Sequence, residues 1–400
     1  MTLLKGKHVV LGVSGSIAAY KAADLTSKLV QAGAVVDVIV TDAAREFVTP
    51  FTFRSLTGRP VYTNMFDPQT SAGEEHVALS RRADLVIVAP ATATTIARIA
   101  YGLADDMLAL TVLATKAPIL IAPAMDSQMW EAAATQDNVA TLKSRGIEFV
   151  GPMSGRLASG NTGAGRLAEP ATIVEAAKHL LARTGDLAGR RIVISAGGTR
   201  EPIDPVRVIT NRSSGKMGYA LAEAARDRGA AVTLVSTVES LPVPYGVAIV
   251  PVETVAEMRD AVLDACKSAD ALIMAAAVSD FRPAEAAVQK IKKGDSGLSV
   301  DLVKNADFFL EVPDEVVKVG FAAETQELLE NAQKKLVEKR LDLNVANDVS
   351  SSDAGFGVDT NRVTILDREG GHEDVPLLPK YEVAQRILDR LVPILKQRRG

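Results

Sequence analysis

The sequence has almost no cysteine, since Cys266 is the single one among 400 residues. A lone thiol excludes an internal disulfide framework and any zinc or iron–sulfur site built from several cysteines. Cys266 stands in the apolar pattern AVLDACKSADALI, so we expect a buried packing residue rather than a reactive one. The scarcity of cysteine fits a reducing, cytoplasmic environment.

Long apolar runs are also missing. A membrane helix needs about 20 uninterrupted apolar residues, and the most apolar region is broken by Asp84, Arg98, Asp105 and Lys116. The first apolar stretch is interrupted at Gly12 and has no cleavage pattern after it, so we expect a first strand rather than a signal peptide. No membrane span is predicted.

An excess of positive charge is absent as well. Lys and Arg number 45 against 49 Asp and Glu, which gives a formal net charge of −4. Such a chain has no overall positive field that would collect nucleic acid or an anionic membrane. Any anionic ligand must therefore be held by local groups.

What the chain does contain is a regular alternation of apolar strands and amphipathic helices. At about 150 residues per domain, its length suggests about two or three domains. Strand patterns occupy 8–13, 35–40, 85–89, 119–122, 191–195, 232–236, 247–250, 272–275, 317–321 and 363–366. Helical patterns occupy 17–31, 96–113, 173–183, 216–228, 255–268, 325–339 and 381–396. The alternation predicts two doubly wound three-layer α/β sandwich domains, residues 1–186 and 187–400, with the break in the segment TGDLAG.

A glycine-rich turn, GVSGSIAAY, joins the first strand to the first helix. Free amides and the helix dipole make such a turn a phosphate site. The spaced glycines of the dinucleotide fingerprint are lacking, and no acidic residue ends the second strand, so a mononucleotide is favoured over NAD. A tight turn that merely needs small residues explains this segment equally well.

Three further segments decide between these interpretations. They are EEHVALSRRADLVIVAPATATTIARIAYGLADDML, APAMDSQMW and SGRLASGNTGAGRLAEP. In this order they resemble the flavoprotein family of cysteine decarboxylases. With the second half, nearly the whole chain resembles the bifunctional phosphopantothenoylcysteine decarboxylases and phosphopantothenate–cysteine ligases of coenzyme A synthesis. The resemblance implies a flavodoxin-like flavoprotein domain followed by a Rossmann-like ligase domain.

The resemblance implies FMN as cofactor of the first domain. FMN oxidises the substrate thiol to a thioaldehyde, carbon dioxide leaves to give an enethiolate, and the electrons then return. His76 would be the acid or base beside the thiol, although as a single residue it could be a helix-surface histidine. The flavin would be contacted by Ser14, Gly15, Ser16, Thr41, Ala91 and Thr92, some of which could instead be helix caps.

The substrate side of the decarboxylase shows two departures from the family. Met125 and Asp126 would line the substrate carboxylate, but the family commonly has Asn where this chain has Asp126. A second anion repels that carboxylate unless Asp126 is protonated or faces elsewhere. The glycine-rich segment 157–167 would be the flap over the substrate, or a plain surface loop. Its Ser159 stands where the family has a proton-donating cysteine, and a hydroxyl is a far weaker acid than a thiol.

The second half opens with AGGTREPIDPVRVITNRSSGKMG, which is dense in glycine, serine and cations and ends at a helix start. Ser213, Ser214 and Gly215 can present amides to a phosphate there, with Arg207 close by. Surface ion pairs would account for the arginine equally well. Downstream lysines near strand ends, together with Asp280, indicate a nucleotide triphosphate and magnesium site.

By resemblance this half is the ligase. The resemblance implies that phosphopantothenate attacks the α-phosphorus of CTP to give an acyl cytidylate and pyrophosphate, and that the amine of L-cysteine then displaces CMP. Lys290 would stabilise charge during these transfers, and Asn211 would orient the acyl intermediate. Asp280 would bind Mg²⁺. CTP would be bound by Ala275, Ala276, Ala277, Asp280, Lys290, Asn305, Ala306, Asp307, Phe308, Phe321, Lys335 and Lys339. The choice of CTP over ATP comes wholly from the resemblance.

Two other function classes remain open at this stage. Some relatives of the flavin domain are regulatory subunits that bind and inhibit a phosphatase, and a flavodoxin-like electron carrier is the third interpretation. The presence of His76 and of a ligase half argues against the regulatory subunit, and a slow, redox-neutral flavin without a stable semiquinone would argue against the electron carrier. The family analogy further implies a homo-oligomer, a dodecamer built from trimeric flavin domains and dimeric ligase domains.

Overall fold

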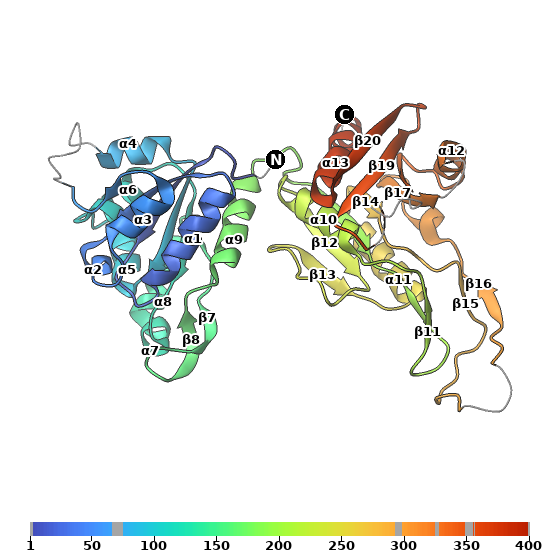
Figure 1. Cartoon of the computed structure of the whole chain (residues 1–400), viewed down its shortest axis with the longest axis horizontal. Helices are drawn as coiled ribbons and strands as arrows, with labels where there is room; N and C mark the ends of the chain where they lie inside the picture. The colour runs from blue at the N-terminus through green and yellow to red at the C-terminus, as the bar shows by residue number, and fades with distance from the viewer. Residues whose placement is uncertain are drawn as a thin grey trace. The chain divides into compact units, whose positions relative to one another are not determined.

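The computed structural model describes residues 3–65, 75–292, 298–324, 328–348, 355 and 357–398. The chain divides into two compact units, Met1–Ala182 and Arg183–Gly400 (Figure 1). Each unit is an α/β structure around a largely parallel sheet, so the predicted fold class is confirmed. Within the described ranges, every helix is too short or too polar to cross a membrane.

The N-terminal unit contains a parallel six-stranded sheet in the order β3-β2-β1-β4-β5-β6. Its strands are β1 (His8–Val13), β2 (Val35–Val40), β3 (Val61–Tyr62), β4 (Leu85–Ala91), β5 (Ile119–Pro123) and β6 (Glu148–Phe149). Without the two-residue edge strand β3, this is the order of a flavodoxin-like sheet. The strand order reverses between β1 and β4, where such folds bind their ligands.

Helices cover both faces of this sheet (Figure 1). One layer consists of α1 (Ala19–Gln31), α3 (Pro50–Thr57) and α9 (Pro170–Ala182), with α1 packed between the other two. The other consists of α4 (Glu75–Arg82), α5 (Ala93–Tyr101), α6 (Met107–Ala114) and α8 (Ala133–Ser144). This second layer shares a core with Val10, Val86 and Ile121 of the strands. The short helices α2 (Asp42–Arg45) and α7 (Ser127–Glu131) follow β2 and β5.

Two expectations for this unit need correction. The single helix predicted over 96–113 is wrong, because α5 ends at Gly102, which adopts a left-handed φ of 70°. A new helix then begins where Asp106 caps α6 by accepting a hydrogen bond from the N–H of Ala109 at 2.7 Å. The segment expected to be a flap or surface loop contains an antiparallel hairpin of β7 (Met153–Arg156) and β8 (Thr162–Arg166).

The C-terminal unit has an eight-stranded sheet in the order β13-β12-β9-β14-β17-β18-β19-β20. Its strands are β9 (Arg191–Ala196), β12 (Ala231–Ser236), β13 (Ala248–Pro251), β14 (Ala271–Met274), β17 (Val317–Glu324), β18 (Leu343–Asp348), β19 (Thr360–Asp367) and β20 (His372–Pro379). The first six run parallel, whereas β19 and β20 are antiparallel. Strands β18 and β20 were not among the expected ones. The order reverses between β9 and β14.

Two cores flank this sheet. On one face lie α10 (Lys216–Arg226) and α13 (Lys380–Gln397), which pack against each other. On the other lie α11 (Val255–Cys266), α12 (Leu328–Glu338) and the 3₁₀ turn η1 (Phe308–Glu311). Cys266 is buried in this second core, as expected, and burial raises the pKa of its thiol to about 12.

The C-terminal unit also contains two small antiparallel hairpins. They are formed by β10 (Arg200–Pro202) with β11 (Val208–Thr210) and by β15 (Phe281–Pro283) with β16 (Leu302–Lys304).

Candidate functional site

The N-terminal unit has a cavity of about 850 Å³ at the carboxyl ends of β1, β2 and β4. Four residues predicted to contact flavin line it, namely Ser14, Gly15, Thr41 and Thr92. The cavity lies where the strand order reverses, at the place expected for a mononucleotide in a sheet of this order. Its volume is within the range of sites for cofactor-sized ligands.

The loop after β1 is held tightly against its neighbours. The hydroxyl of Ser14 donates to the carbonyl of Pro90 at 2.7 Å and accepts from the N–H of Thr92 at 3.0 Å. A Cβ added at Gly15 would lie 2.4 Å from the Cβ of Ala43, so only glycine allows this approach. The hydroxyls of Thr41 and Thr92 cap α2 and α5. Ser14 and the two threonines therefore shape the cavity as well as lining it.

The other two predicted flavin contacts lie elsewhere. Ala91 is fully buried at the end of β4 and does not line this cavity. Ser16 lines a second cavity, of about 450 Å³, which lies between the start of α1 and the β7–β8 hairpin.

This second cavity brings together the predicted substrate residues and the flap. Met125, Asp126 and Ser159 all line it. The N–H of Met125 donates to the carbonyl of Gly165 at 3.0 Å, which ties strand β8 to the loop after β5. A Cβ at Gly165 would lie 2.2 Å from the carbonyl oxygen of Met125. The hairpin is therefore seated directly on the Met125 loop.

Asp126 faces the cavity as a carboxylate. The hydroxyl of Ser159 donates to Oδ2 of Asp126 at 2.7 Å, and the N–H of Gln128 donates to Oδ1 at 3.1 Å. The bond from Ser159, followed by that from Gln128, lowers the pKa of Asp126 below its ordinary value of 3.8. Asp126 would not repel a substrate carboxylate if it were protonated or faced away from the cavity. The structure shows neither arrangement.

Cations that the sequence analysis did not single out line the same cavity. They are Lys21 on α1 and Arg156 and Arg166 on the hairpin. Glu169 accepts hydrogen bonds from Lys21 at 3.0 Å and from Arg166 at 3.1 Å. Three cations minus the one anion, Asp126, leave the lining of this cavity with a formal charge of +2. A sequence signal existed, because Arg156 directly precedes the glycine-rich segment 157–167 and Arg166 lies within it.

His76 lies in the first turn of α4 and is half-buried. This residue, which the structure describes, lines neither cavity of its own chain.

The C-terminal unit has a cavity of about 420 Å³ at the carboxyl ends of β14 and β17 and at the start of α10. Many predicted residues line it, namely Asn211, Ser213, Ser214, Gly215, Ala275, Ala276, Ala277, Asp280, Phe321 and Lys335. Gly215 caps α10 with a left-handed φ of 74°. The serines thus stand where the helix presents its amino end to the cavity.

A further hollow of about 250 Å³ adjoins this cavity and shares Ala276, Asp280, Phe321 and Lys335 with it. It adds the predicted residues Asn305, Ala306, Asp307, Phe308 and Lys339. Lys339 pairs with Asp307 at 2.9 Å, and its ammonium lies 6.0 Å from the centre of the Phe309 ring.

Two asparagine side chains fasten the loop after β14. The amide of Asn211 donates to the carbonyls of Ala277 at 3.3 Å and Val278 at 3.1 Å. The amide of Asn305 donates to the carbonyl of Ser279 at 2.9 Å. Both side chains therefore set the path of the segment that leads to Asp280.

Arg207 and Lys290, both described residues, line neither hollow. Arg207 pairs with the buried Asp204 at 3.0 Å, and Asp204 also accepts from the N–H of Ile291 at 3.2 Å. Burial raises the pKa of Asp204, but hydrogen bonds from the N–H groups of Val206, Ile291 and Arg207 outweigh it and lower that pKa below 3.8. Asp204, which the sequence analysis missed, therefore anchors both the Arg207 loop and the Lys290 segment.

Two more lysines, Lys216 and Lys380, line the cavity of about 420 Å³. Lys216 donates to Asp359 at 2.7 Å and to the carbonyl of Gly357 at 3.1 Å. Lys380 is buried, and its ammonium donates to three carbonyls, those of Gly355, Val358 and Thr360. Burial lowers the pKa of Lys380, and the positive charge of Lys216 adds to this effect.

Asn347, near the end of β18, is another residue that the sequence analysis missed. Its side-chain oxygen is buried without a hydrogen-bond partner among the described residues, and the residue lines the ligase cavity. A buried acceptor normally has a partner. Asn347 is therefore suited to accept a hydrogen bond from a ligand.

The predicted metal ligand, Asp280, is exposed at the cavity. In the part of the chain that the structure describes, three or more acidic, histidine or cysteine side chains do not gather into a metal cage. A single carboxylate nevertheless fits Mg²⁺, which commonly takes one or two carboxylates and completes its shell with phosphates and water.

Comparison with known proteins matches both units. The family model described as "DNA/pantothenate metabolism flavoprotein C-terminal domain" matches residues 187–394, and the model described as "Flavoprotein" matches residues 2–182. The coenzyme A biosynthesis bifunctional protein CoaBC of Bacillus subtilis is 48% identical over 401 residues, covering 99% of each chain. The protein of the same name from Escherichia coli K12 is 46% identical over 397 residues, covering 97% of each.

Solved structures match one unit each. The C-terminal domain of a coenzyme A biosynthesis bifunctional protein CoaBC is 40% identical, with a TM-score of 0.46, over 53% of this chain and 99% of that one. The FMN-dependent cysteine decarboxylase SpaF is 31% identical, with a TM-score of 0.38, over 44% of this chain and 99% of that one.

Proposed function

Since this chain belongs to the family of coenzyme A biosynthesis bifunctional proteins, with a ligase and a decarboxylase activity, we propose how its two units share the work. The C-terminal unit joins L-cysteine to 4′-phosphopantothenate with CTP. The N-terminal unit then decarboxylates 4′-phosphopantothenoylcysteine to 4′-phosphopantetheine with FMN. The observation that carries the proposal is that each unit has a cavity at its own strand-order reversal that is lined by some of the residues expected there.

FMN fits the larger cavity of the N-terminal unit. The close approach at Gly15 leaves the loop after β1 beside the cavity, where backbone amides can hold a phosphate. FMN, when bound, supplies the capacity to take two electrons from the substrate thiol and return them after carbon dioxide has left.

The second cavity holds the substrate in this proposal. Lys21, Arg156 and Arg166 attract its anionic groups, while the hairpin excludes water. Ser159, held at 2.7 Å from Asp126, supplies or relays the proton that completes the product. The carboxylate of Asp126 keeps that hydroxyl in place, and it orients the hairpin tip over the cavity.

His76 acts as the acid or base beside the thiol in this proposal. Because it lines neither cavity of its own chain, we assign it to a flavin site that is completed by a neighbouring subunit. This assignment agrees with the proposed dodecamer of trimeric flavin domains and dimeric ligase domains. Sedimentation of the purified protein as a monomer would contradict it.

The ligase cavity supplies positive charge and oriented amides for the nucleotide. The amino end of α10 and Lys216 face the phosphates, and Lys335 and Lys339 extend this positive surface into the adjoining hollow. Asp280 holds Mg²⁺ together with phosphate oxygens. Asn211 orients the acyl intermediate, Lys290 stabilises developing charge, and Asn347 accepts a hydrogen bond from the bound substrates.

Two analyses of the purified protein test the cofactor and the nucleotide. Heat denaturation followed by mass spectrometry identifies the released flavin, which we expect to be FMN. Chromatography of the ligase reaction separates CMP from AMP, and we expect CMP in a 1:1 ratio to amide product, with Mg²⁺ required. Release of FAD, or ligation with ATP at equal efficiency, would refute the corresponding part of the proposal.

A further inference from the structure

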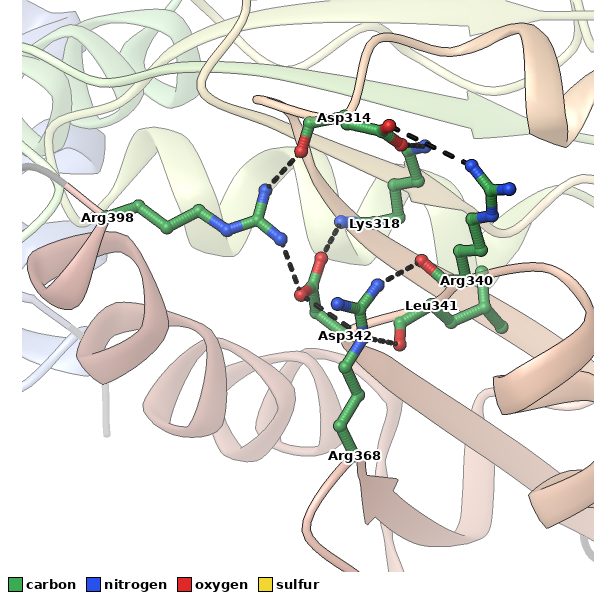
Figure 2. A network of polar contacts seen from close by, with 7 residues as sticks. All are labelled: Asp314, Lys318, Arg340, Leu341, Asp342, Arg368 and Arg398. Carbon is green, nitrogen blue, oxygen red and sulfur yellow. Dashed lines mark hydrogen bonds and ion pairs between the residues drawn. The ribbon is translucent and has the colours of Figure 1, made fainter.

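A basic cavity of about 460 Å³ lies at the amino edge of the C-terminal sheet, separate from the ligase cavity. It surrounds the beginnings of two strands, where Lys318 is the second residue of β17 and Asp342 precedes β18 (Figure 2). Phe321, later in β17, lines the ligase cavity. The two cavities thus adjoin opposite ends of the same strand.

Positive charge predominates in this cavity. It is lined by Lys318, Arg340, Arg368 and Arg398 against two carboxylates, Asp314 and Asp342, so four cations minus two anions leave a formal charge of +2. The chain as a whole has a net charge of −4. A local excess of this sign favours an anionic ligand.

Both oxygens of the Asp342 carboxylate already accept hydrogen bonds from the protein (Figure 2). One oxygen accepts from the backbone N–H of Lys318 at 2.8 Å, and the other accepts from Arg398 at 2.7 Å. Arg368 donates to two backbone carbonyls, those of Arg340 and Leu341, and its guanidinium lies 3.6 Å from Asp342. Arg368 and Arg398 thus share the single negative charge of Asp342.

Lys318 is the most deeply buried cation of this cavity, with a side chain that is only 2% exposed. Among the described residues, its ammonium has one acceptor, Asp314 at 3.4 Å, whose own side chain is 76% exposed. An ammonium group has three donors, and a buried cation is costly unless it is paired at close range. In the described part of the chain, the nearest carboxylate to the guanidinium of Arg340 is also that of Asp314, and it lies 3.8 Å away.

We propose that this cavity binds a small phosphate-bearing molecule, whose oxygens complete the contacts of Lys318 and Arg340. The ammonium of Lys318 and the guanidinium of Arg340 lie on the same exposed carboxylate, that of Asp314, at 3.4 and 3.8 Å, and groups of these two kinds bind the oxygens of a phosphate. Val316, Leu336 and Val337 provide an apolar wall beside the charges. The cavity therefore suits a phosphate ester with an apolar part.

The site is placed to influence the proposed nucleotide site. The segment from α12 to the start of β18 lies between the ligase side and the basic cavity. Some of its residues line one and some line the other. Lys335, Lys339 and Leu341 line the ligase side, whereas Leu336, Val337, Arg340 and Asp342 line the basic cavity. A ligand that fixes Arg340 restricts the same segment that carries Lys339. Its binding is therefore coupled to nucleotide affinity, a consequence that rests on the proposed function.

Calorimetric titration of the full-length protein tests the site itself. The probes are inorganic phosphate and phenyl phosphate, and the variants are Arg340→Gln and a control, Arg386→Gln, an exposed arginine on α13 outside the cavity. We expect saturable binding that Arg340→Gln weakens about tenfold, through loss of a charge-assisted hydrogen bond. Arg386→Gln and Lys339→Gln should bind as the wild type does.

Equal affinity of Arg340→Gln and the wild type overturns the site, and so does a loss confined to Lys339→Gln. Tighter binding of phenyl phosphate identifies a phosphate ester as the ligand class, whereas equal binding identifies free phosphate. In the ligase assay, phenyl phosphate should change the KM for CTP by about fivefold more in the wild type than in Arg340→Gln. An equal change in both contradicts the coupling and leaves the proposed function untouched.

Discussion

At the scale of single residues, hydrogen bonds that the sequence does not display decide several roles. The residues that the family resemblance assigns to the nucleotide line the ligase cavities, apart from Lys290. Asp204 was missed, because its role depends on backbone N–H groups from two separate segments. The cations of the second cavity were missed for a related reason, since only the folded hairpin brings them beside Asp126.

Ser159 offers the first test at this scale. We expect Ser159→Ala to slow completed decarboxylation about a hundredfold, as is typical when a positioned proton donor is removed. Ser159→Cys, the matched control, should retain turnover because the thiol is a stronger acid. The pKa of Asp126 should rise toward 3.8 in Ser159→Ala, since its main stabilising hydrogen bond is lost. Product analysis and carboxyl NMR titration measure the two effects. Unchanged turnover in Ser159→Ala would remove this hydroxyl from the mechanism.

Asp204→Asn is expected to impair ligation and spare decarboxylation. Displacing catalytic groups by about 1 Å can cost about 10²-fold, and Asp204 holds both the Arg207 loop and the Lys290 segment. Rates of the two half-reactions, measured separately, check this expectation. Equal loss of both would indicate general misfolding instead.

The same variant predicts a pH dependence of stability. The pKa of Asp204 is below 3.8 in the folded chain, so its contribution is complete at pH values above the unfolded pKa. It is lost as the pH falls through the folded value. The difference in urea midpoint between wild type and Asp204→Asn should therefore stay constant from pH 7 to about pH 5 and shrink below about pH 4. A difference that grows on acidification would contradict the assigned ionisation.

At the scale of elements, the alternation of apolar strands and amphipathic helices was enough to predict the two parallel sheets. This prediction from periodicity failed where helix-ending residues or the composition of an edge strand decided the local structure. The continuous apolar spacing over 96–113 hid the helix end at Gly102, although glycine followed by Asp106 is a recognisable stop and start. Strand β20 begins with His372, Glu373 and Asp374 and contains two prolines, so it lacks the continuous apolar run of a central strand.

The seating of the β7–β8 hairpin can be tested at Gly165. In Gly165→Ala the added methyl would lie 2.2 Å from the carbonyl of Met125, so the hairpin must move off the substrate cavity. We expect decarboxylation to fall at least about tenfold, with ligation unchanged. Gly160→Ala at the hairpin tip is the control, because its methyl meets no atom within 4 Å and only the left-handed φ of 90° adds strain. Equal effects of the two variants would show that the close approach to Met125 does not decide how the hairpin is seated.

At the scale of the whole molecule, each unit has its own core and its own cavities. The product of the C-terminal unit is the substrate of the N-terminal unit, so the two reactions need to share only a diffusing intermediate. Asn211→Asp should abolish ligation alone, and His76→Asn should retain flavin but stop at 4′-phosphopantothenoylcysteine. An equal mixture of the two variants should then restore the complete conversion. Failure of the mixture, with each remaining half-reaction intact, would show that the intermediate does not pass between molecules.

The most direct test of the central claim is mass spectrometry of the products formed when the wild-type protein meets 4′-phosphopantothenate, L-cysteine, CTP and Mg²⁺. The account predicts 4′-phosphopantetheine, carbon dioxide and one CMP for each product molecule. A reaction that stops at 4′-phosphopantothenoylcysteine, or at a product lighter than 4′-phosphopantetheine by two hydrogens, would contradict the roles assigned to Asp126 and Ser159.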